Sequence, residues 1–266
     1  MGLFDRFRTK KTEPVQQEAE QSQHEDSGIV LGFVLLDSLS CDFNQFLTHL
    51  NTEWNVQVKN TPDEETFVFE VGHMKVACAY LPAPIPNNEV EECCKFNLLW
   101  PDAEQVVSKH QAHVIVTVMG ATDPIEAHVL FTQVTSSLLQ LDNALAIYMA
   151  PMVMSAEYYI KSAAMLKENE LPVQLWVFIG LYHNQQQSSS YTRGMRKFGK
   201  EELEIIQSQH SLGDVFEFMM VITSYIIGSN VTLRSGETIG FTADQRLPLT
   251  LSQGSAVEGN TLKVGF

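Results

Sequence analysis

The stretch that decides the fold class is residues 112–142, with the sequence AHVIVTVMGATDPIEAHVLFTQVTSSLLQLD. Its first part is rich in valine and isoleucine, which predicts a strand over residues 113–119. Asp123 followed by Pro124 is typical of a helix start, because aspartate caps exposed amide groups and proline suits the first helical position. Apolar residues then recur at helical spacing, which predicts a helix over residues 124–142.

Similar patterns lie on both sides of this segment. Before it, apolar runs and turn residues predict strands over 29–36, 66–71 and 74–80 and helices over 43–50 and 101–109. After it, they predict strands over 144–149 and 173–182, helices over 154–167 and 212–228, a polar loop over 185–190, an extended segment over 191–206 and terminal strands over 231–242. Both halves follow the order strand-helix-strand-strand-helix-strand, which is that of a split βαβ module.

We therefore expect an α+β protein made of two ferredoxin-like halves joined by a helix, with one larger α+β domain as the alternative. The expected parts are a flexible leader at 1–28, an N-terminal half at 29–122, the connecting helix at 123–142 and a C-terminal half at 143–266. The leader is expected to be flexible because it is polar and lacks apolar periodicity.

Composition excludes several functional classes. The chain has 266 residues, 17 Lys and Arg, and 32 Asp and Glu, which gives a formal net charge of -15. This charge argues against nucleic-acid binding, which needs clustered cations. It is typical either of a solvated acidic surface or of a surface that attracts a protein partner with a basic surface. The four cysteines do not form the pattern of a disulfide framework, so we expect a reducing, cytoplasmic environment.

The most apolar stretch is residues 215–227, which contains Glu217 and Ser224. It is shorter than the ~20 residues that a membrane span needs, so we expect a buried helix and no stable membrane insertion. Because this helix would be apolar nearly all round, it is also a candidate interface for a homo-oligomer.

Two motifs have part of the pattern of a phosphate or zinc site, but each lacks a feature that such a site requires. Residues 194–200 match the spacing G-x-x-x-x-G-K of a phosphate-binding loop, but Glu201 occupies the place of the Ser or Thr that holds magnesium. Cys93 and Cys94 precede His110 and His113, but adjacent cysteines do not have the spacing of a zinc ligand pair. We therefore predict no metal and no cofactor.

Several blocks in the same order resemble one known family. They are Leu81 to Pro86, Ala112 to Thr117, Leu171 to Val177, Gly236 to Gly240, and above all YTRGMRKFGKEELEI at residues 191–205. Together they are similar to the bacterial domain-of-unknown-function family 4261, over about residue 29 to the C-terminus. The resemblance implies a bacterial cytoplasmic protein whose distinctive residues follow position 190, and it implies no catalytic residue.

Five residues are candidates for a binding site: His113, Thr192, Arg193, Arg196 and Glu202. In one interpretation, an arginine pairs with Glu202 or Glu204, two carboxylates on one strand face, and only stiffens the turn. In the other, the loop recognises a partner or a small anion.

Three functional hypotheses follow from these observations. The first is a non-enzymatic protein-binding module, of an inhibitor or immunity-like kind, because acidic proteins can mask basic active sites. The second is a small-molecule-binding protein or hydrolase with a site near residues 190–206, in a pocket lined by His113, Arg193 and Glu202. The third is a homo-oligomeric scaffold. The sequence leaves open whether the protein is an enzyme.

Overall fold

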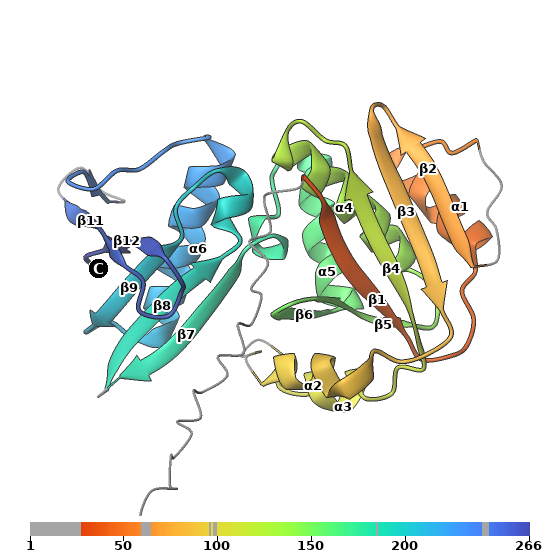
Figure 1. Cartoon of the computed structure of the whole chain (residues 1–266), viewed down its shortest axis with the longest axis horizontal. Helices are drawn as coiled ribbons and strands as arrows, with labels where there is room; N and C mark the ends of the chain where they lie inside the picture. The colour runs from red at the N-terminus through yellow and green to blue at the C-terminus, as the bar shows by residue number, and fades with distance from the viewer. Residues whose placement is uncertain (1–27, 60–64, 96, 98–99, 185, 241–244) are drawn as a thin grey trace, which may run out of the picture.

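The computed structural model describes residues 28–59, 65–95, 97, 100–184, 186–240 and 245–266. The predicted flexible leader lies outside the described residues except for Gly28. Within the described residues the chain forms two lobes, each built on a six-stranded sheet (Figure 1). The first lobe comprises residues 28–168 and the second comprises residues 178–266. Helices accompany both sheets, which confirms the predicted α+β class.

The first sheet is antiparallel throughout, with the strand order β2-β3-β4-β1-β5-β6. Its strands are β1 (Val30–Leu36), β2 (Thr66–Val71), β3 (Met74–Leu81), β4 (Ala112–Met119), β5 (Ala144–Met149) and β6 (Met152–Ser155). The central strand β1 pairs with β4 on one side and with β5 on the other. Strand β6 is therefore an edge strand.

Helices cover both faces of the first sheet. Three helices pack on one face, namely α1 (Phe43–Trp54), α4 (Pro124–Leu138) and α5 (Ala156–Ala163). Two short helices, α2 (Glu89–Cys94) and α3 (Ala103–Val107), pack on the other face (Figure 1). The alternation of β1 produces this arrangement, because Val34 contributes to the first cluster and Leu35 to the second. A short 3-10 helix, η1 (Pro86–Asn88), precedes α2.

The second sheet has the order β10-β11-β12-β9-β8-β7 and leaves β7 at an edge. Its strands are β7 (Phe178–Asn184), β8 (Gln187–Arg193), β9 (Leu203–Ser208), β10 (Thr238–Ile239), β11 (Leu247–Gln253) and β12 (Asn260–Val264). Strands β9 and β12 are parallel, and the other pairs are antiparallel. Helix α6 (Leu212–Gly228) starts with a capping box of Ser211 and Asp214 and packs on β7 and β8.

The two lobes share one continuous hydrophobic core. The 3-10 helix η2 (Ala164–Glu168) ends the first lobe, and the link that follows contains the 3-10 helix η3 (Val173–Leu175) and then Trp176. The Trp176 ring packs against His128 of α4, at 5.6 Å between centroids, and against Phe198, at 5.9 Å. Phe198 belongs to η4 (Met195–Phe198) in the second lobe. This aromatic contact fixes the lobes against each other.

The connectivity differs from the predicted ferredoxin-like order. In the first sheet two strands, β3 and β4, separate β1 from β2, and β1 runs antiparallel to β2, so β1-α1-β2 is not a split βαβ unit. The second sheet begins as a meander of β7, β8 and β9. The strand order of neither sheet follows the predicted ferredoxin-like pattern, because pairing between strands distant in sequence decides that order.

The expected boundary after residue 142 also differs from the division between the sheets. Strands β5 and β6 follow that residue but complete the first sheet, because β5 pairs with β1. The predicted connecting helix, α4, ends at Leu138 and packs on β4 and β1 together with α1 and α5. The lobes are joined instead by residues 169–177.

Local predictions were accurate where periodicity was strong. The bounds of β5 and α6 agree with the structure, and so does the hairpin of β2 and β3 to within one residue. The predicted polar loop at 185–190 is wrong over its described part from residue 187, which forms β8. Strands β11 and β12 were not predicted, and residues 173–175 form a 3-10 helix in place of the start of a strand.

In the part of the chain that the structure describes, no helix is long and apolar enough to cross a membrane. Helix α6 buries most of its apolar side chains within the monomer, and Val215, Met219, Ile222 and Ile226 lie in the core. Val221 and Tyr225 are about half exposed.

Candidate functional site

The turn between β8 and β9 is built around the Glu202 carboxylate. The Thr192 hydroxyl donates to Oε2 of Glu202 at 2.7 Å, and the Gly194 amide donates to Oε1 at 2.8 Å. The Thr192 oxygen accepts in turn from the Leu203 amide at 2.8 Å. Gly194 has φ +120°, a conformation that favours glycine, and a Cβ there would lie 3.0 Å from the Trp176 carbonyl oxygen. Thr192 and Glu202 therefore hold the turn.

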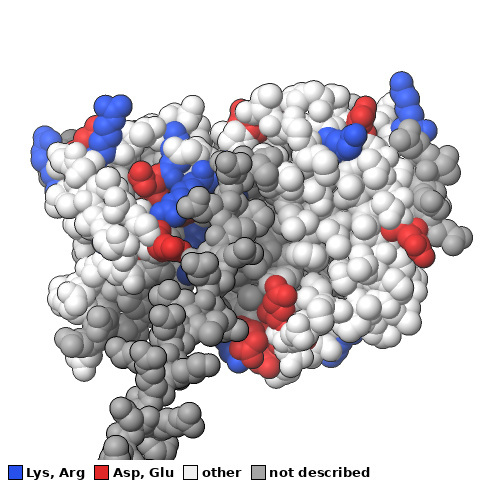
Figure 2. Space-filling model, in the orientation of Figure 1, with Lys and Arg blue, Asp and Glu red and all other residues white. Residues whose placement is uncertain are grey.

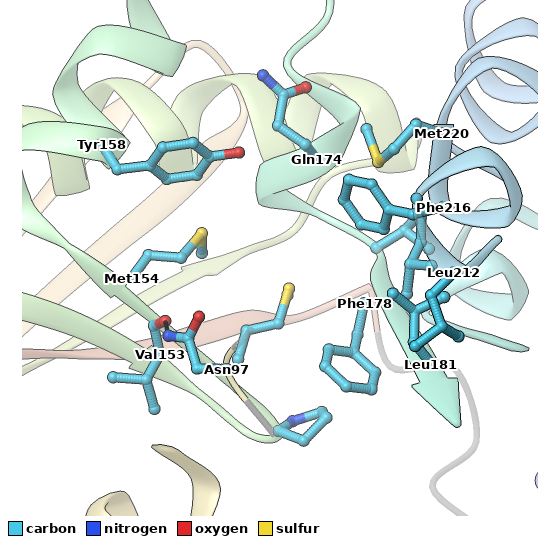
Figure 3. A pocket seen from close by; sticks show the side chains of 15 residues that line it. Asn97, Val153, Met154, Tyr158, Gln174, Phe178, Leu181, Leu212, Phe216 and Met220 are labelled. Atoms are coloured by element: carbon cyan, nitrogen blue, oxygen red, sulfur yellow. Dashed lines mark hydrogen bonds between the residues drawn. The ribbon is translucent and has the colours of Figure 1, made fainter. Parts of the chain in front are cut away.

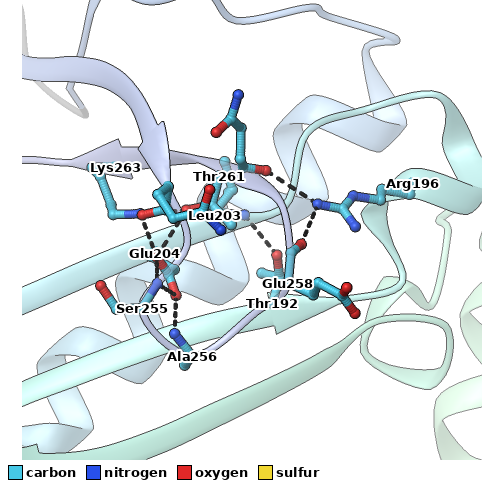
Figure 4. Close-up of polar contacts among 11 residues, drawn as sticks. Thr192, Arg196, Leu203, Glu204, Ser255, Ala256, Glu258, Thr261 and Lys263 are labelled. Carbon is cyan, nitrogen blue, oxygen red and sulfur yellow. Dashed lines mark hydrogen bonds and ion pairs between the residues drawn. The ribbon is translucent and has the colours of Figure 1, made fainter. Parts of the chain in front are cut away.

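A second buried carboxylate, Glu204, fastens the loop between β11 and β12 (Figure 4). Its oxygens accept from the Ser255 and Ala256 amides and from the Thr261 hydroxyl. Burial by itself raises the pKa of Glu204, but the ion pair with Lys263 and these hydrogen bonds hold the pKa below its ordinary value.

Arg196 supports the same loop from the other side. Its Nη2 donates to the carbonyl oxygens of Glu258 at 2.8 Å and Asn260 at 3.1 Å (Figure 4). Among the described residues, no ion pair joins Arg193 or Arg196 to Glu202 or Glu204. The turn is therefore stiffened by hydroxyl and amide donors, and the arginine–glutamate pair considered from the sequence is not formed.

His113 lies apart from the other four candidate residues. It is on β4 opposite Leu35 of β1, it is buried, and its Nδ1 donates to the Ala83 carbonyl oxygen at 2.8 Å. Burial lowers the pKa of His113, and the hydrogen bond to Ala83 partly offsets this. Arg193 lines a cavity to which β1 contributes Val30 and Leu31, and Leu31 is four residues before Leu35, or about 13 Å along the strand. His113, Arg193 and Glu202 therefore do not converge in one pocket.

The junction of the lobes contains a cavity of about 310 Å³, which we call the apolar chamber (Figure 3). Edge strands of both sheets contribute to it, as does the first half of α6. Its apolar lining comprises Pro151, Met152, Val153, Met154, Val177, Phe178, Ile179, Leu181, Leu212, Gly213, Phe216 and Met220. Asn97, Tyr158 and Gln174 add a few polar groups. Such a cavity, apolar with few polar groups, is typical of small-molecule sites.

Asn97 is fixed at the wall of the chamber by a hydrogen bond to the edge strand β6. Its Nδ2 donates to the Val153 carbonyl oxygen at 2.7 Å. This bond satisfies a carbonyl group that strand pairing leaves open at the sheet edge. Phe216 and Met220, one helical turn apart on α6, face the chamber from the second lobe (Figure 3).

A second cavity, of about 180 Å³, adjoins the apolar chamber, and we call it the basic chamber. Both cavities are lined by Pro151, Met152 and Phe178. The basic chamber is also lined by Arg193, Gly194 and Lys197 of the second lobe and by Val30, Leu31 and His128 of the first. Of the five candidate residues, only Arg193 lines either chamber.

His128 is a buried histidine between the lobes. Its Nδ1 donates to the Pro124 carbonyl oxygen at 2.7 Å, and its ring packs against Phe198 at 4.6 Å between centroids. Burial lowers the pKa of His128 to about 4, and the nearby Lys197 charge acts in the same direction. The imidazole is therefore neutral at pH 7.

Among the described residues, no group of three or more His, Cys, Asp or Glu side chains is placed to hold a metal ion. Both histidines of the His110–His113 pair form hydrogen bonds with the backbone of the proline-containing segment before α2. His110 accepts from the Ile85 amide through Nε2, and His113 donates to Ala83.

The chamber residues were missed because no motif contains them. Met152, Phe178 and Phe216 belong to β6, β7 and α6, and each has an ordinary apolar side chain. One indication was available: α6 is apolar nearly all round, and Phe216 and Met220 lie outside the stripe of Val215, Met219 and Ile222 that enters the core.

The C-terminal part of the chain matches a known protein family. Residues 191–265 match the model of a family described as "Domain of unknown function (DUF4261)". The matched segment begins on β8 and contains the turn at Glu202, the loop held by Glu204 and all of α6. No curated protein and no solved structure matches the chain.

Proposed function

With residues 191–265 assigned to the DUF4261 family, we propose that this protein is a binding module for a small molecule with an apolar body, held in the apolar chamber between the lobes. The observation that carries the proposal is a cavity of about 310 Å³ with a largely apolar lining. This volume lies within the range of about 300–1,000 Å³ that is usual for ligand pockets.

The composition of the wall supports an adaptable apolar fit. Three methionines, Met152, Met154 and Met220, line the chamber beside Phe178 and Phe216. Methionine is flexible and polarisable, so such walls adjust to ligands of different shape. Asn97, Tyr158 and Gln174 would orient the ligand through a small number of hydrogen bonds.

Filling the chamber tests this proposal. Met220→Trp places a larger side chain at a half-buried position of the wall, whereas Val221→Trp adds the same ring at the next residue, which is 51% exposed. Nile red, a neutral apolar dye, serves as the probe in a fluorescence titration. We expect Met220→Trp to weaken dye binding about tenfold or more, equivalent to about 1.4 kcal/mol. Val221→Trp should leave it unchanged.

Thermal unfolding of both variants verifies that each is folded. Equal dye affinity in the wild type and in a folded Met220→Trp variant would contradict the proposal, as would the absence of dye binding to the wild type. Native mass spectrometry of protein purified from its host would then identify the ligand by mass.

A protein partner with a basic surface is our second proposal. It is supported by the formal net charge of -15 and by the acidic surface of α2 and α3, where Glu92, Asp102 and Glu104 are exposed. Pull-down from the host at low and moderate salt, with Glu104→Lys beside the wild type, tests it. Recovery of a stoichiometric partner by the wild type, with weaker recovery by the variant, is the expected result.

We further propose a cytoplasmic location, supported by four cysteines that are all unpaired.

A further inference from the structure

The basic chamber adds a cationic end to the apolar site. Arg193 and Phe178 are directly opposite each other in the antiparallel pair of β8 and β7. Directly opposed residues project from the same face of a sheet, so the Arg193 side chain stands beside the ring of Phe178. Since Phe178 lines both chambers and Arg193 lines the basic one, the cation lies where the two cavities adjoin.

The Arg193 guanidinium packs against an aromatic side chain. It lies over the Tyr191 ring at 5.7 Å from the centroid, and Tyr191 contacts Phe178 at 6.0 Å between centroids. Gly180 makes this arrangement possible, because a Cβ there would lie 2.2 Å from Cζ of Tyr191. Arg193 is exposed, and no ion pair joins it to a carboxylate among the described residues. Its hydrogen-bonding edge is therefore available to an anion.

The local charge differs from that of the whole molecule. The chain has a formal net charge of -15, yet four of its 17 Lys and Arg residues lie between positions 193 and 200. Figure 2 shows several Lys and Arg side chains, with Asp and Glu side chains beside them, on the second lobe where it meets the first. Lys197 lines the basic chamber together with Arg193. A cation in a partly enclosed cavity attracts a negatively charged group more strongly than it would in open solvent.

We propose that the ligand of the inter-lobe site is an amphipathic anion, whose apolar chain occupies the apolar chamber and whose carboxylate is bound by Arg193 in the basic chamber. This inference rests on the proposed function, because it assigns the charge of the ligand that the apolar chamber holds. The carboxylate and the guanidinium form a charge-assisted, planar pair, for which arginine is better suited than lysine.

Three probes with the same alkyl chain separate the two proposals: octanoate, octan-1-ol and octylammonium, each titrated calorimetrically below its aggregation concentration. We expect octanoate to bind about tenfold or more tightly than octan-1-ol, and octylammonium to bind most weakly. Arg193→Met retains an apolar stem and removes the charge. It should lower octanoate affinity about tenfold or more and leave octan-1-ol affinity unchanged.

Arg234→Met is the matched control, because Arg234 is exposed and lines neither chamber. It should leave the affinities of all three probes unchanged. Binding of octan-1-ol with no preference for octanoate, or octanoate binding that Arg193→Met does not weaken, would overturn this inference and leave the proposed function standing. If none of the three probes bound, the proposed function and this inference would both fall.

Discussion

Trp176 donates its indole N–H to the hydroxyl of Thr132 at 2.9 Å, in a buried contact between the link and helix α4. The Thr132 hydroxyl in turn donates to the His128 carbonyl oxygen at 2.7 Å. Together with the aromatic packing of Trp176 against His128 and Phe198, this bond ties the start of the second lobe to the first. The walls of both chambers depend on this attachment, because residues 175–178 contribute to them.

Removing this hydrogen bond should destabilise the protein measurably. We expect Trp176→Phe, which retains an aromatic ring, to lower the free energy of unfolding by about 1–2 kcal/mol, and Trp176→Ala to lower it by about 3–5 kcal/mol. Urea denaturation measures both. Trp54→Phe is the control, since Nε1 of Trp54 has no hydrogen-bond partner among the described residues. A smaller effect for Trp176→Phe than for the control would contradict the role assigned to the bond.

Stability should depend on pH through His128. Its pKa is about 4 in the folded protein and about 6.5 in an unfolded chain, so between these values the unfolded state binds more protons. The free energy of unfolding is therefore highest above pH 6.5 and decreases as the pH falls to 4, by about 3 kcal/mol at most from this residue. His128→Phe should flatten this decrease in urea titrations. His73→Gln, at an exposed residue, is the control and should retain it.

Glu202 should contribute to stability and not to ligand binding. Glu202→Gln replaces an acceptor of the Thr192 hydroxyl and the Gly194 amide with a group that is also a donor, and we expect a loss of about 1–3 kcal/mol. The neighbouring Glu201→Gln, at an exposed side chain, should be nearly neutral. A double-mutant cycle with Thr192→Val should give a coupling of about 0.5 kcal/mol or more. Strict additivity would show that the bond contributes nothing.

A side chain at position 180 should destabilise the protein while Tyr191 is present. Gly180→Ala places a Cβ 2.2 Å from Cζ of Tyr191, so the ring must move, and we expect a loss of about 1–3 kcal/mol. Adding Tyr191→Ser should restore part of the lost stability, because it removes the ring. By contrast, Gly228→Ala meets no atom within 4 Å at the end of α6 and should be neutral or stabilising. Thermal unfolding distinguishes these outcomes, and equal effects of the two glycine substitutions would refute the steric explanation.

The sequence by itself determined the elements whose periodicity is local and strong. Asp123 and Pro124 begin α4 as predicted, and the apolar run of α6 gave both of its ends, because capping and burial of one stripe act within a few residues. The α+β class follows from the same patterns. The motif at 191–205 also located the turn whose hydrogen bonds center on Glu202.

Only the tertiary structure decided how these elements assemble. Residues 188–190 are three serines with no alternation of apolar and polar residues, yet they form a buried strand because β7 and β9 pair with both of its edges. The chambers bring together Met152, Phe178 and Phe216 from separate elements. Such contacts depend on strand pairing and core packing between residues distant in sequence, and a pattern confined to a few neighbouring residues does not contain that information.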